Sequence, residues 1–250
     1  MLSAPQPAAL WDWFSPEQPG PLVGPHVLQT GHGTCFVDRW PGPRAVAAAV
    51  GGNVTLRGDP EALSAADVRP HLDGTIEAAA AFEPLLRAAF PALAVWERII
   101  FELPGPPRAR RYPVAAQVRR LAADDAAHVA RLSPSLAWIA GTWDGPASLA
   151  ASGYAWGAFV DQRLCSLACS FFVGTRYEDI GVVTEPAFRG RGLSTACAAG
   201  LCGDILARGR RPSWSTSLDN TSSRYVAERL GFVEHRRDRL LLSRGPMPEP

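Results

Sequence analysis

The sequence predicts an α/β protein whose mixed, mostly antiparallel sheet is flanked by helices and is preceded by a smaller α/β domain. The first observation is a β-branched strand-like run, Tyr177–Thr184, that leads through a Pro turn and an Arg-Gly-rich loop into the helical pattern of residues 193–207. The second is an earlier series of strand-like and helical runs in the order β-β-β-α-α-β. The third is a hydrophobic content of 47% over 250 residues, which suffices for a sizeable core.

Charge and hydropathy restrict the class of protein. The formal net charge is +1, so no strong electrostatic field favours nucleic acid or a membrane surface. No apolar run approaches about 18 residues and no signal peptide precedes the prolines that begin at Pro5, so we expect a cytoplasmic protein without membrane contact. The five cysteines show no C-x-x-C spacing, which favours buried, reduced thiols over a disulfide or metal role.

Residues 1–25 are expected to form a short arm that docks on the rest of the protein. Its prolines exclude a long helix. Three aromatic residues within positions 11–14 favour burial against another surface.

Residues 26–103 are predicted to form the smaller domain, and residues 104–111, rich in Pro and Arg, the linker after it. Gly51-Gly52 is typical of a hairpin turn between two of its strands. The runs predicted in this domain are strands at 34–40, 44–50, 53–57 and 95–102 and helices at 61–71 and 75–90.

Residues 112–245 are predicted to form the second domain. Leu193, Cys197, Leu201 and Ile205 recur every four residues on its longest helix and indicate one buried face. The other runs predicted there are strands at 114–121, 155–161, 164–173, 177–184, 212–217 and 232–243 and short helices at 124–132 and 133–138.

The loop before the helix of residues 193–207 has the chemistry of an anion-binding site. The first amides of a helix have no partner within it, and the helix dipole places about half a positive charge there. Gly190 and Gly192 leave room for a pyrophosphate beside the backbone, and Arg189 and Arg191 supply guanidinium donors. The chain contains no lysine and neither a Walker A nor a G-x-G-x-x-G pattern, so those two phosphate motifs are excluded.

At these residues the chain resembles the GCN5-related N-acetyltransferase (GNAT) superfamily. The acyl-CoA motif of that superfamily, [QR]-x-x-G-x-[GA], matches Arg189, Gly192 and Ser194, although Ser194 replaces the usual Gly or Ala. A second motif, Asn followed by E-[KR]-L-G-F on a helix, matches residues 220–232 after the strand-like run 212–217. The motifs look most like the branch that includes the zwittermicin-resistance acetyltransferase.

The resemblance implies a GNAT fold that binds acetyl-CoA between the strands ending at Thr184 and Ser217. The Val182 amide would point at the thioester oxygen, which gives Val182 a catalytic role through its main chain. The smaller domain has the element order of a degenerate copy without the Arg-Gly loop, and a cap that shapes the substrate site is the other interpretation. The residues implied as cofactor contacts are Val182, Val183, Thr184, Arg189, Gly190, Arg191, Gly192, Leu193, Ser194, Asn220 and Ser223.

Glu178 is the residue that we expect to act as the catalytic base. It lies four residues before Val182, where the histone-acetylating branch has a glutamate, and strand alternation puts both on one face. A carboxylate paired with an arginine at the strand end is the other interpretation. Asp179 faces the opposite side and is the second choice, and a bulge would exchange the two.

The usual general acid of the superfamily is missing. Many members carry Tyr seven residues after the motif Asn, whereas Ala227 stands here and Tyr225 lies about 200° away around the helix. The leaving thiolate is therefore expected to take its proton from solvent or with help from Ser223.

The acceptor is expected to be the amine of a small molecule, attacked directly in a ternary complex. Trp138 and Trp143 are candidate walls of the acceptor pocket, with core packing as the other interpretation. We expect no metal, because the five histidines show no ligand spacing, and a monomer or homodimer. The missing tyrosine leaves a non-catalytic acyl-CoA-binding or protein-interaction module as the alternative function.

Overall fold

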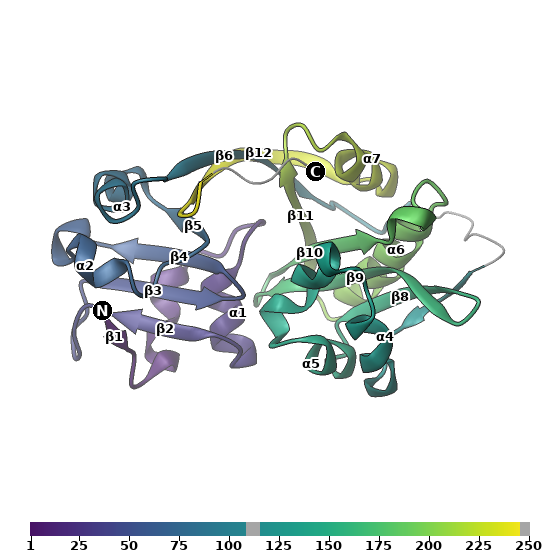
Figure 1. The fold of residues 1–250 in the computed structure, drawn as a ribbon, viewed down its shortest axis with the longest axis horizontal. Coiled ribbons are helices and arrows are strands. Elements are labelled where there is room, and N and C mark those ends of the chain that lie inside the picture. The colour runs from purple at the N-terminus through teal and green to yellow at the C-terminus, as the bar shows by residue number, and fades with distance from the viewer. Residues whose placement is uncertain (109–115, 246–250) are drawn as a thin grey trace.

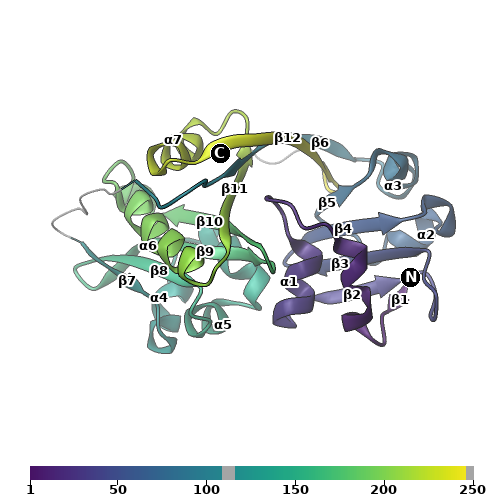
Figure 2. The ribbon, with the colours of Figure 1, turned by 180° about the vertical axis from the view of Figure 1, so that it is seen from behind.

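Twelve strands form one continuous sheet in the computed structural model, which describes residues 1–108 and 116–245. Figures 1 and 2 show two lobes, one from each half of the chain, with the long strands β6 (Ala94–Glu102) and β12 (Val233–Leu242) reaching from one to the other. The strand order is β1-β2-β3-β4-β5-β12-β6-β11-β10-β9-β8-β7. Only the β4–β5 and β10–β11 pairs in this described sheet are parallel, so the predicted mostly antiparallel sheet is confirmed.

The second half of the chain follows the predicted order closely. Its elements are β7 (Gln117–Arg120), α4 (Ala126–Ala130), the 3-10 helix η5 (Pro134–Trp143), α5 (Pro146–Ala151), β8 (Ala155–Val160), β9 (Arg163–Val173), β10 (Tyr177–Thr184), α6 (Leu193–Ala207), β11 (Arg211–Ser217) and α7 (Thr221–Leu230). The first residues of the strand predicted at 114–121 lie outside the described residues.

Helix α6 is the crossover between the parallel strands β10 and β11. Its predicted face, Leu193, Cys197, Leu201 and Ile205, is buried against the sheet together with α7. Gly200 allows α6 to pack closely, because a Cβ there would lie 2.5 Å from the Trp156 ring. Helices α4, η5 and α5 pack on the opposite face of the sheet.

The first half of the chain differs from the prediction in its helices. Residues 75–78, predicted as the start of a helix, form strand β5, because Thr75 and Ile76 pair with both β4 and β12. The helix predicted at 61–71 shrinks to four residues between Pro60 and Pro70. The elements are β1 (Leu2–Ser3), η1 (Pro7–Phe14), α1 (Val23–Thr30), β2 (Thr34–Val37), β3 (Ala45–Val50), β4 (Asn53–Gly58), η2 (Pro60–Ala62), α2 (Ala65–Val68), β5 (Thr75–Ala78), η3 (Ala80–Phe82) and α3 (Glu83–Ala89).

The two halves share a topology and exchange their last strands. Each half contains a parallel pair, β4–β5 or β10–β11, whose strands are joined through a helical segment and followed by another helix and a last strand. The last strand of the first half, β6, pairs with β11, and the last strand of the second half, β12, pairs with β5. This arrangement supports the interpretation of the first half as a degenerate copy. It also carries the sheet across the predicted domain boundary at residue 103.

The arm packs into the first lobe. Leu10 and Phe14 are buried, and the Phe14 ring lies so close to Gly24 that a Cβ there would meet it at 2.3 Å. All five cysteines are buried and unpaired. Across residues 1–108 and 116–245, no helix combines the length and the apolar character needed to cross a membrane.

His26 of α1 joins the two halves through both ring nitrogens. Its Nδ1 accepts from the Val173 amide at 3.1 Å, and its Nε2 lies 2.8 Å from the Thr142 carbonyl oxygen, to which it donates. Because Nδ1 accepts a hydrogen bond, it carries no proton, so the ring is neutral and its proton lies on Nε2. Burial lowers the pKa of His26 to about 4, although the Thr142 carbonyl opposes the shift.

Replacing His26 with Gln is expected to remove a pH-sensitive part of the stability. The unfolded imidazole titrates near 6.5 and the folded one near 4, so wild-type stability falls as the pH drops below 6.5. Between pH 7 and pH 5 the wild type should lose about 2 kcal/mol more than His26→Gln, whose amide keeps one donor and one acceptor. Urea unfolding at both pH values measures the difference, and parallel losses in the two proteins would contradict this role of His26.

Candidate functional site

Strands β10 and β11 part and form a fork. Their parallel pairing stops at Ile180 and Trp214. Beyond these residues β10 continues to pair with β9, and β11 continues to pair with β6. Among the described residues, the backbone edges of 181–184 and 215–217 thus face each other without a ladder between them. Such an edge presents free amides and carbonyls to an extended ligand.

The loop that follows β10 opens at the mouth of the fork. Gly190 and Gly192 adopt φ values of 75° and 76°, a region that side chains disfavour. A Cβ at Gly190 would meet nothing within 4 Å, so this loop has open space around it. Gly192 is the N-cap of α6, where no side chain caps the helix and no acidic residue lies in the first turn. The helix therefore presents its first amides and its positive dipole end to an anion.

The loop arginines and the first helical residues have different roles. Arg189 and Arg191 are exposed, and the Arg191 guanidinium lies 4.9 Å from the Phe188 ring and donates to the Ala187 carbonyl. Leu193 packs into the core, so only its main chain faces the loop, whereas Ser194 is partly exposed. The chemistry of these residues fits a pyrophosphate, because an open, glycine-containing loop carries two exposed arginines and leads into the uncapped N-terminus of α6.

The other predicted cofactor contacts are placed differently. Val182 and Thr184 are partly exposed beside the fork, while Val183 faces the opposite core. The Asn220 side chain caps α7 by accepting from the Ser223 amide at 3.0 Å. The Ser223 hydroxyl accepts from the Trp214 indole at 2.9 Å.

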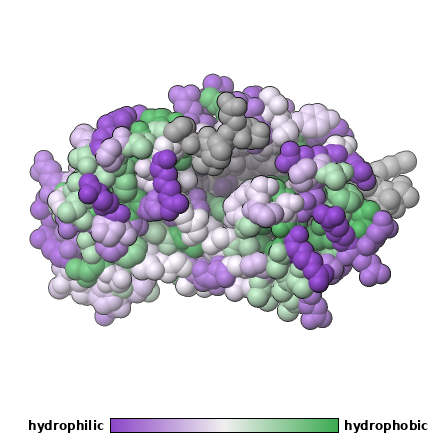
Figure 3. All heavy atoms as spheres, viewed as in Figure 1, coloured by the Kyte–Doolittle hydropathy of each residue, from purple (hydrophilic) through white to green (hydrophobic). Residues whose placement is uncertain are grey.

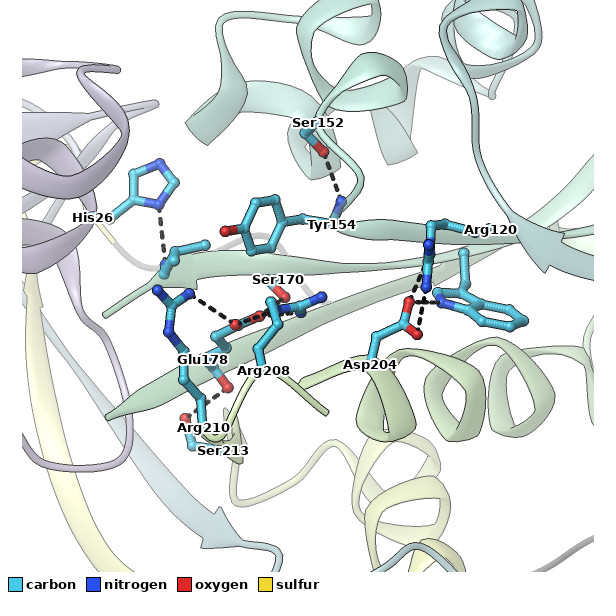
Figure 4. A network of polar contacts seen from close by, with 12 residues as sticks. His26, Arg120, Ser152, Tyr154, Ser170, Glu178, Asp204, Arg208, Arg210 and Ser213 are labelled. Carbon is cyan, nitrogen blue, oxygen red and sulfur yellow. Dashed lines mark hydrogen bonds and ion pairs between the residues drawn. The ribbon is translucent and has the colours of Figure 1, made fainter. Parts of the chain in front are cut away.

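Glu178 is unsuited to the role of base that the sequence suggested. Its carboxylate is fully buried and is bound by Arg208 through 2.9 Å and 2.7 Å hydrogen bonds, by Arg210 at 3.1 Å and by Ser170 (Figure 4). Both arginines lie in the connection between α6 and β11. With its oxygens held by two guanidinium groups, Glu178 has no free path to an amine, and the arginine-paired interpretation describes it.

Asp179 points to the other face of β10, toward β11. Its carboxylate accepts from Ser213 at 2.8 Å and from Ser215 at 3.1 Å, both on β11. Burial raises the pKa of Asp179 to about 6, although the serine hydroxyls and the Arg98 charge oppose the shift. The residue lies directly before the last paired position, at the base of the fork. A bulge does occur here, but in β9, where Phe171 is the extra residue between the pairs made by Asp179 and Ile180.

A polar stripe continues from Asp179 across the same face of the sheet. Arg98 of β6 binds Asp238 of β12 through hydrogen bonds of 2.8–3.1 Å, and Arg236 lies 3.5 Å from Asp238. The register puts Ser217 beside Arg98 and Arg98 beside Asp238. The face of the sheet beside the fork is therefore charged, and we call Arg98, Arg236 and Asp238 its charged floor.

The two candidate tryptophans occupy different environments. Trp143 is buried, and its indole donates to the Ser170 carbonyl at 3.0 Å, so it belongs to the core. Trp138 is 50% exposed and packs edge-on against Phe171 at 5.4 Å. Phe171 in turn lies over Gly181, where a Cβ would approach it to 3.1 Å. Trp138 therefore borders the fork on the Asp179 face.

A polar pocket of about 250 Å³ lies between the arm and strands β4 and β5 of the first lobe. Figure 3 shows the surface hollowed between the two lobes, with hydrophilic and hydrophobic residues mixed around it. The charged and polar side chains that line the pocket are Glu17, Gln18, Thr55, Arg57, Glu77 and Arg236.

The parallel pair of the first half has no comparable anion site. The loop after β4 contains Asp59 and Glu61 where the second half has its Arg-Gly loop. Helix α2 has four residues, and its N-terminus is closed by the capping box of Ser64 and Asp67. Acidic side chains and satisfied amides both disfavour a phosphate.

Sequence reasoning missed the contribution of β11. The alternation of Ser213, Ser215 and Ser217 is a readable signal for one polar face, yet nothing local shows that this face receives Asp179. The register between β10 and β11 decides that contact.

Comparison with known proteins points to acetyltransferases. The GNAT acetyltransferase family model matches residues 23–238. An uncharacterized N-acetyltransferase of Streptomyces virginiae is 40% identical over 198 residues, covering 78% of this chain and 84% of its own. A GCN5-related N-acetyltransferase-like protein of Streptococcus suis superposes with a TM-score of 0.73 at 18% identity, over 96% of this chain and 98% of that one. A tandem GNAT protein from the clavulanic acid biosynthesis pathway superposes with a TM-score of 0.59 at 15% identity, over 97% and 95%.

The family match and the Streptomyces relative show that the protein is an acetyltransferase. The chain belongs to the GNAT acetyltransferase family. The resemblance to the zwittermicin-resistance branch stays a prediction.

Proposed function

We propose that the protein transfers the acetyl group of acetyl-CoA to the amino group of a small polar molecule, with Asp179 as the base. The observation that carries the proposal is the position of this carboxylate at the base of the fork, where the serines of β11 hold it next to the last paired residue of β10. Glu178, on the other face, is neutralised by Arg208 and Arg210. Family members use acetyl-CoA, and the open loop here fits its pyrophosphate.

The loop and the fork would divide the cofactor between them. Arg189, Arg191 and the first amides of α6 would hold the pyrophosphate, with Gly190 and Gly192 allowing close approach. The edge of Val182–Thr184 would hold the extended pantetheine arm through main-chain hydrogen bonds, and the Val182 amide would polarise the thioester carbonyl. Acetyl-CoA supplies the activated acyl group.

Proton removal follows the hydrogen bonds around Asp179. The amine nitrogen attacks the carbonyl carbon, the carbon–sulfur bond breaks, and the ammonium proton must leave. Asp179 lies three residues before Val182, roughly 10 Å along the strand, so the proton needs a relay. Ser215 is partly exposed and donates to Asp179 at 3.1 Å, and it can pass the proton on from a water.

Within the described residues, no tyrosine occupies the place of the usual general acid on α7. Ala227 is fully buried, and Tyr225 is 56% exposed and hydrogen-bonded to Arg229. Solvent therefore supplies the proton to the leaving thiolate. The mixed charges of Arg98, Arg236 and Asp238 favour an acceptor with several polar groups over a hydrophobic amine.

Thiol release with a panel of small polar amines tests the proposed function, together with mass spectrometry of the products. Acetylated amine that appears only with enzyme and acetyl-CoA is the expected result. Binding of acetyl-CoA without any acetylated product across the panel would favour a non-catalytic module.

The Gly192→Val substitution is expected to weaken acetyl-CoA binding at least about tenfold, or roughly 1.4 kcal/mol. The β-branched side chain would fill the approach to the first amides of α6 and would strain a backbone with φ of 76°. Isothermal titration calorimetry with acetyl-CoA measures the change.

The Gly31→Val substitution is the matched control. Gly31 has φ of 77° and is the C-cap of α1, where a Cβ would meet nothing within 4 Å. The backbone strain should be similar, whereas the affinity for acetyl-CoA should be unchanged. Equal losses of affinity in both variants would show that backbone strain, and not the loop, controls binding.

A further inference from the structure

The arm crosses four neighbouring strands, β10, β11, β6 and β12, next to Asp179. Residues 16–20 run from the start of β10 to β12 and are held at several points along the way. We propose that this segment is a strap that keeps Asp179 dry and in place, with Glu17 as its anchor and Gly20 as its contact. Glu17 and Gly20 are then positioning residues, and the proposal rests on the proposed function only in taking Asp179 as the base.

Glu17 fixes the first end of the strap in the turn between β9 and β10. Its carboxylate accepts from the Thr175 amide and hydroxyl at 2.8 Å each, from the Arg176 amide at 2.8 Å and from the Tyr177 amide at 2.7 Å. Gly174 is required beside it, because a Cβ there would lie 2.3 Å from the carboxylate. Four hydrogen bonds to one carboxylate at a turn form a strong attachment.

Gly20 connects the strap to the base. Its amide donates to the Ser213 hydroxyl at 3.2 Å, and that hydroxyl donates to Asp179 at 2.8 Å. The chain of hydrogen bonds Gly20–Ser213–Asp179 fixes both the direction of the hydroxyl and the carboxylate that receives it. Gly20 also packs over Ile100, where a Cβ would come within 3.5 Å of that side chain.

The far end of the strap is held by β12. The Pro19 carbonyl accepts from Arg236, whose guanidinium lies near Asp238. The strap thus covers the polar face of β10, β11, β6 and β12. Glu17 and Gln18 of the strap also line the pocket of the first lobe. The strap separates the pocket from Asp179, which is 5% exposed.

The charges around Asp179 set the sign of the expected effects. Burial is the largest influence on the pKa of Asp179 and raises it. The charge of Arg98 on β6 lowers this pKa, and the charge of Asp238 on β12 raises it. Glu178 on the neighbouring position points to the other face, toward Arg208 and Arg210. Loosening the strap admits water and should lower the pKa, whereas deleting the Ser213 hydroxyl removes a donor to the ionised carboxylate and should raise it.

Carbon-13 NMR of protein labelled at the aspartate side-chain carboxyl tests the strap, with Asp179→Asn to assign the signal. Glu17→Gln should move the Asp179 titration down by about one unit, toward the ordinary aspartate value, and Ser213→Ala should move it up. Glu97→Gln, an exposed change on β6, is the control and should leave it in place.

A titration of Asp179 that stays unchanged in Glu17→Gln, with only a lower melting temperature, would make the arm a purely stabilising segment and overturn the proposal. If Glu17→Gln does not fold, the milder Thr175→Val decides, because it removes one of the four hydrogen bonds to Glu17, and an unchanged Asp179 titration in that variant overturns the proposal. The shifts are read without turnover. If the Asp179 titration shifts as expected but Asp179→Asn keeps full activity, Asp179 is not the base, whereas the role of the strap is still supported.

Discussion

The Asp179→Asn substitution should lower the rate of acetyl transfer by about 10²- to 10⁴-fold while leaving acetyl-CoA binding unchanged. The amide keeps the size of the carboxylate and its place between Ser213 and Ser215, but it cannot take the proton that reaches it from the ammonium. Steady-state kinetics with the best amine of the panel and calorimetry with acetyl-CoA separate the two effects. A variant that keeps its turnover would exclude Asp179 as the base.

The pH profile gives an independent check on the same residue. With a pKa of about 6, Asp179 is ionised at neutral pH, so kcat/KM of the wild type should rise with pH through about 6 and then level off. The raised pKa also means that ionising Asp179 costs stability as the pH rises through 6. Asp179→Asn should therefore be at least as stable as the wild type at pH 7, which thermal unfolding measures, so lost activity cannot be traced to unfolding.

Local patterns sufficed to predict the loop and the helix behind it. The Arg-Gly loop and the buried face of α6 follow from spacing over a few residues, and the structure has both. The start of β5 was misread, because Thr75–Ala78 is too short to show a period and becomes a strand only through its neighbours β4 and β12.

The acid–base chemistry was harder to predict because it depends on distant contacts. Glu178 and Asp179 are adjacent, and alternation assigns them to opposite faces without saying what each face meets. Arg208 and Arg210 lie about thirty residues away, and Arg98 belongs to the other half of the chain. The exchange of β6 and β12 brings Arg98 to this face, and no local signal reports an exchange of strands.

The Glu178→Gln substitution is expected to destabilise the protein by about 3 to 5 kcal/mol, because it leaves two partly buried guanidinium groups without their counter-charge. The side chains of Arg208 and Arg210 are 27% and 15% exposed, whereas that of Glu178 is fully buried. Urea unfolding at pH 7 measures the loss. The Glu234→Gln substitution on β12 is the control, since its partner Arg237 and Glu234 itself are well exposed, and it should cost less than about 1 kcal/mol.

The position of this ion pair connects stability to the site. Glu178 is the second residue of β10, Arg208 is the C-cap of α6 and Arg210 precedes β11 (Figure 4). The ion pair therefore closes one end of the unit whose other end carries the fork and the Arg-Gly loop. Where Glu178→Gln still folds, it should therefore bind acetyl-CoA more weakly but keep the pH profile that Asp179 sets. If Glu178→Gln lost the rise of kcat/KM near pH 6 and Asp179→Asn kept it, the roles of the two carboxylates would be reversed.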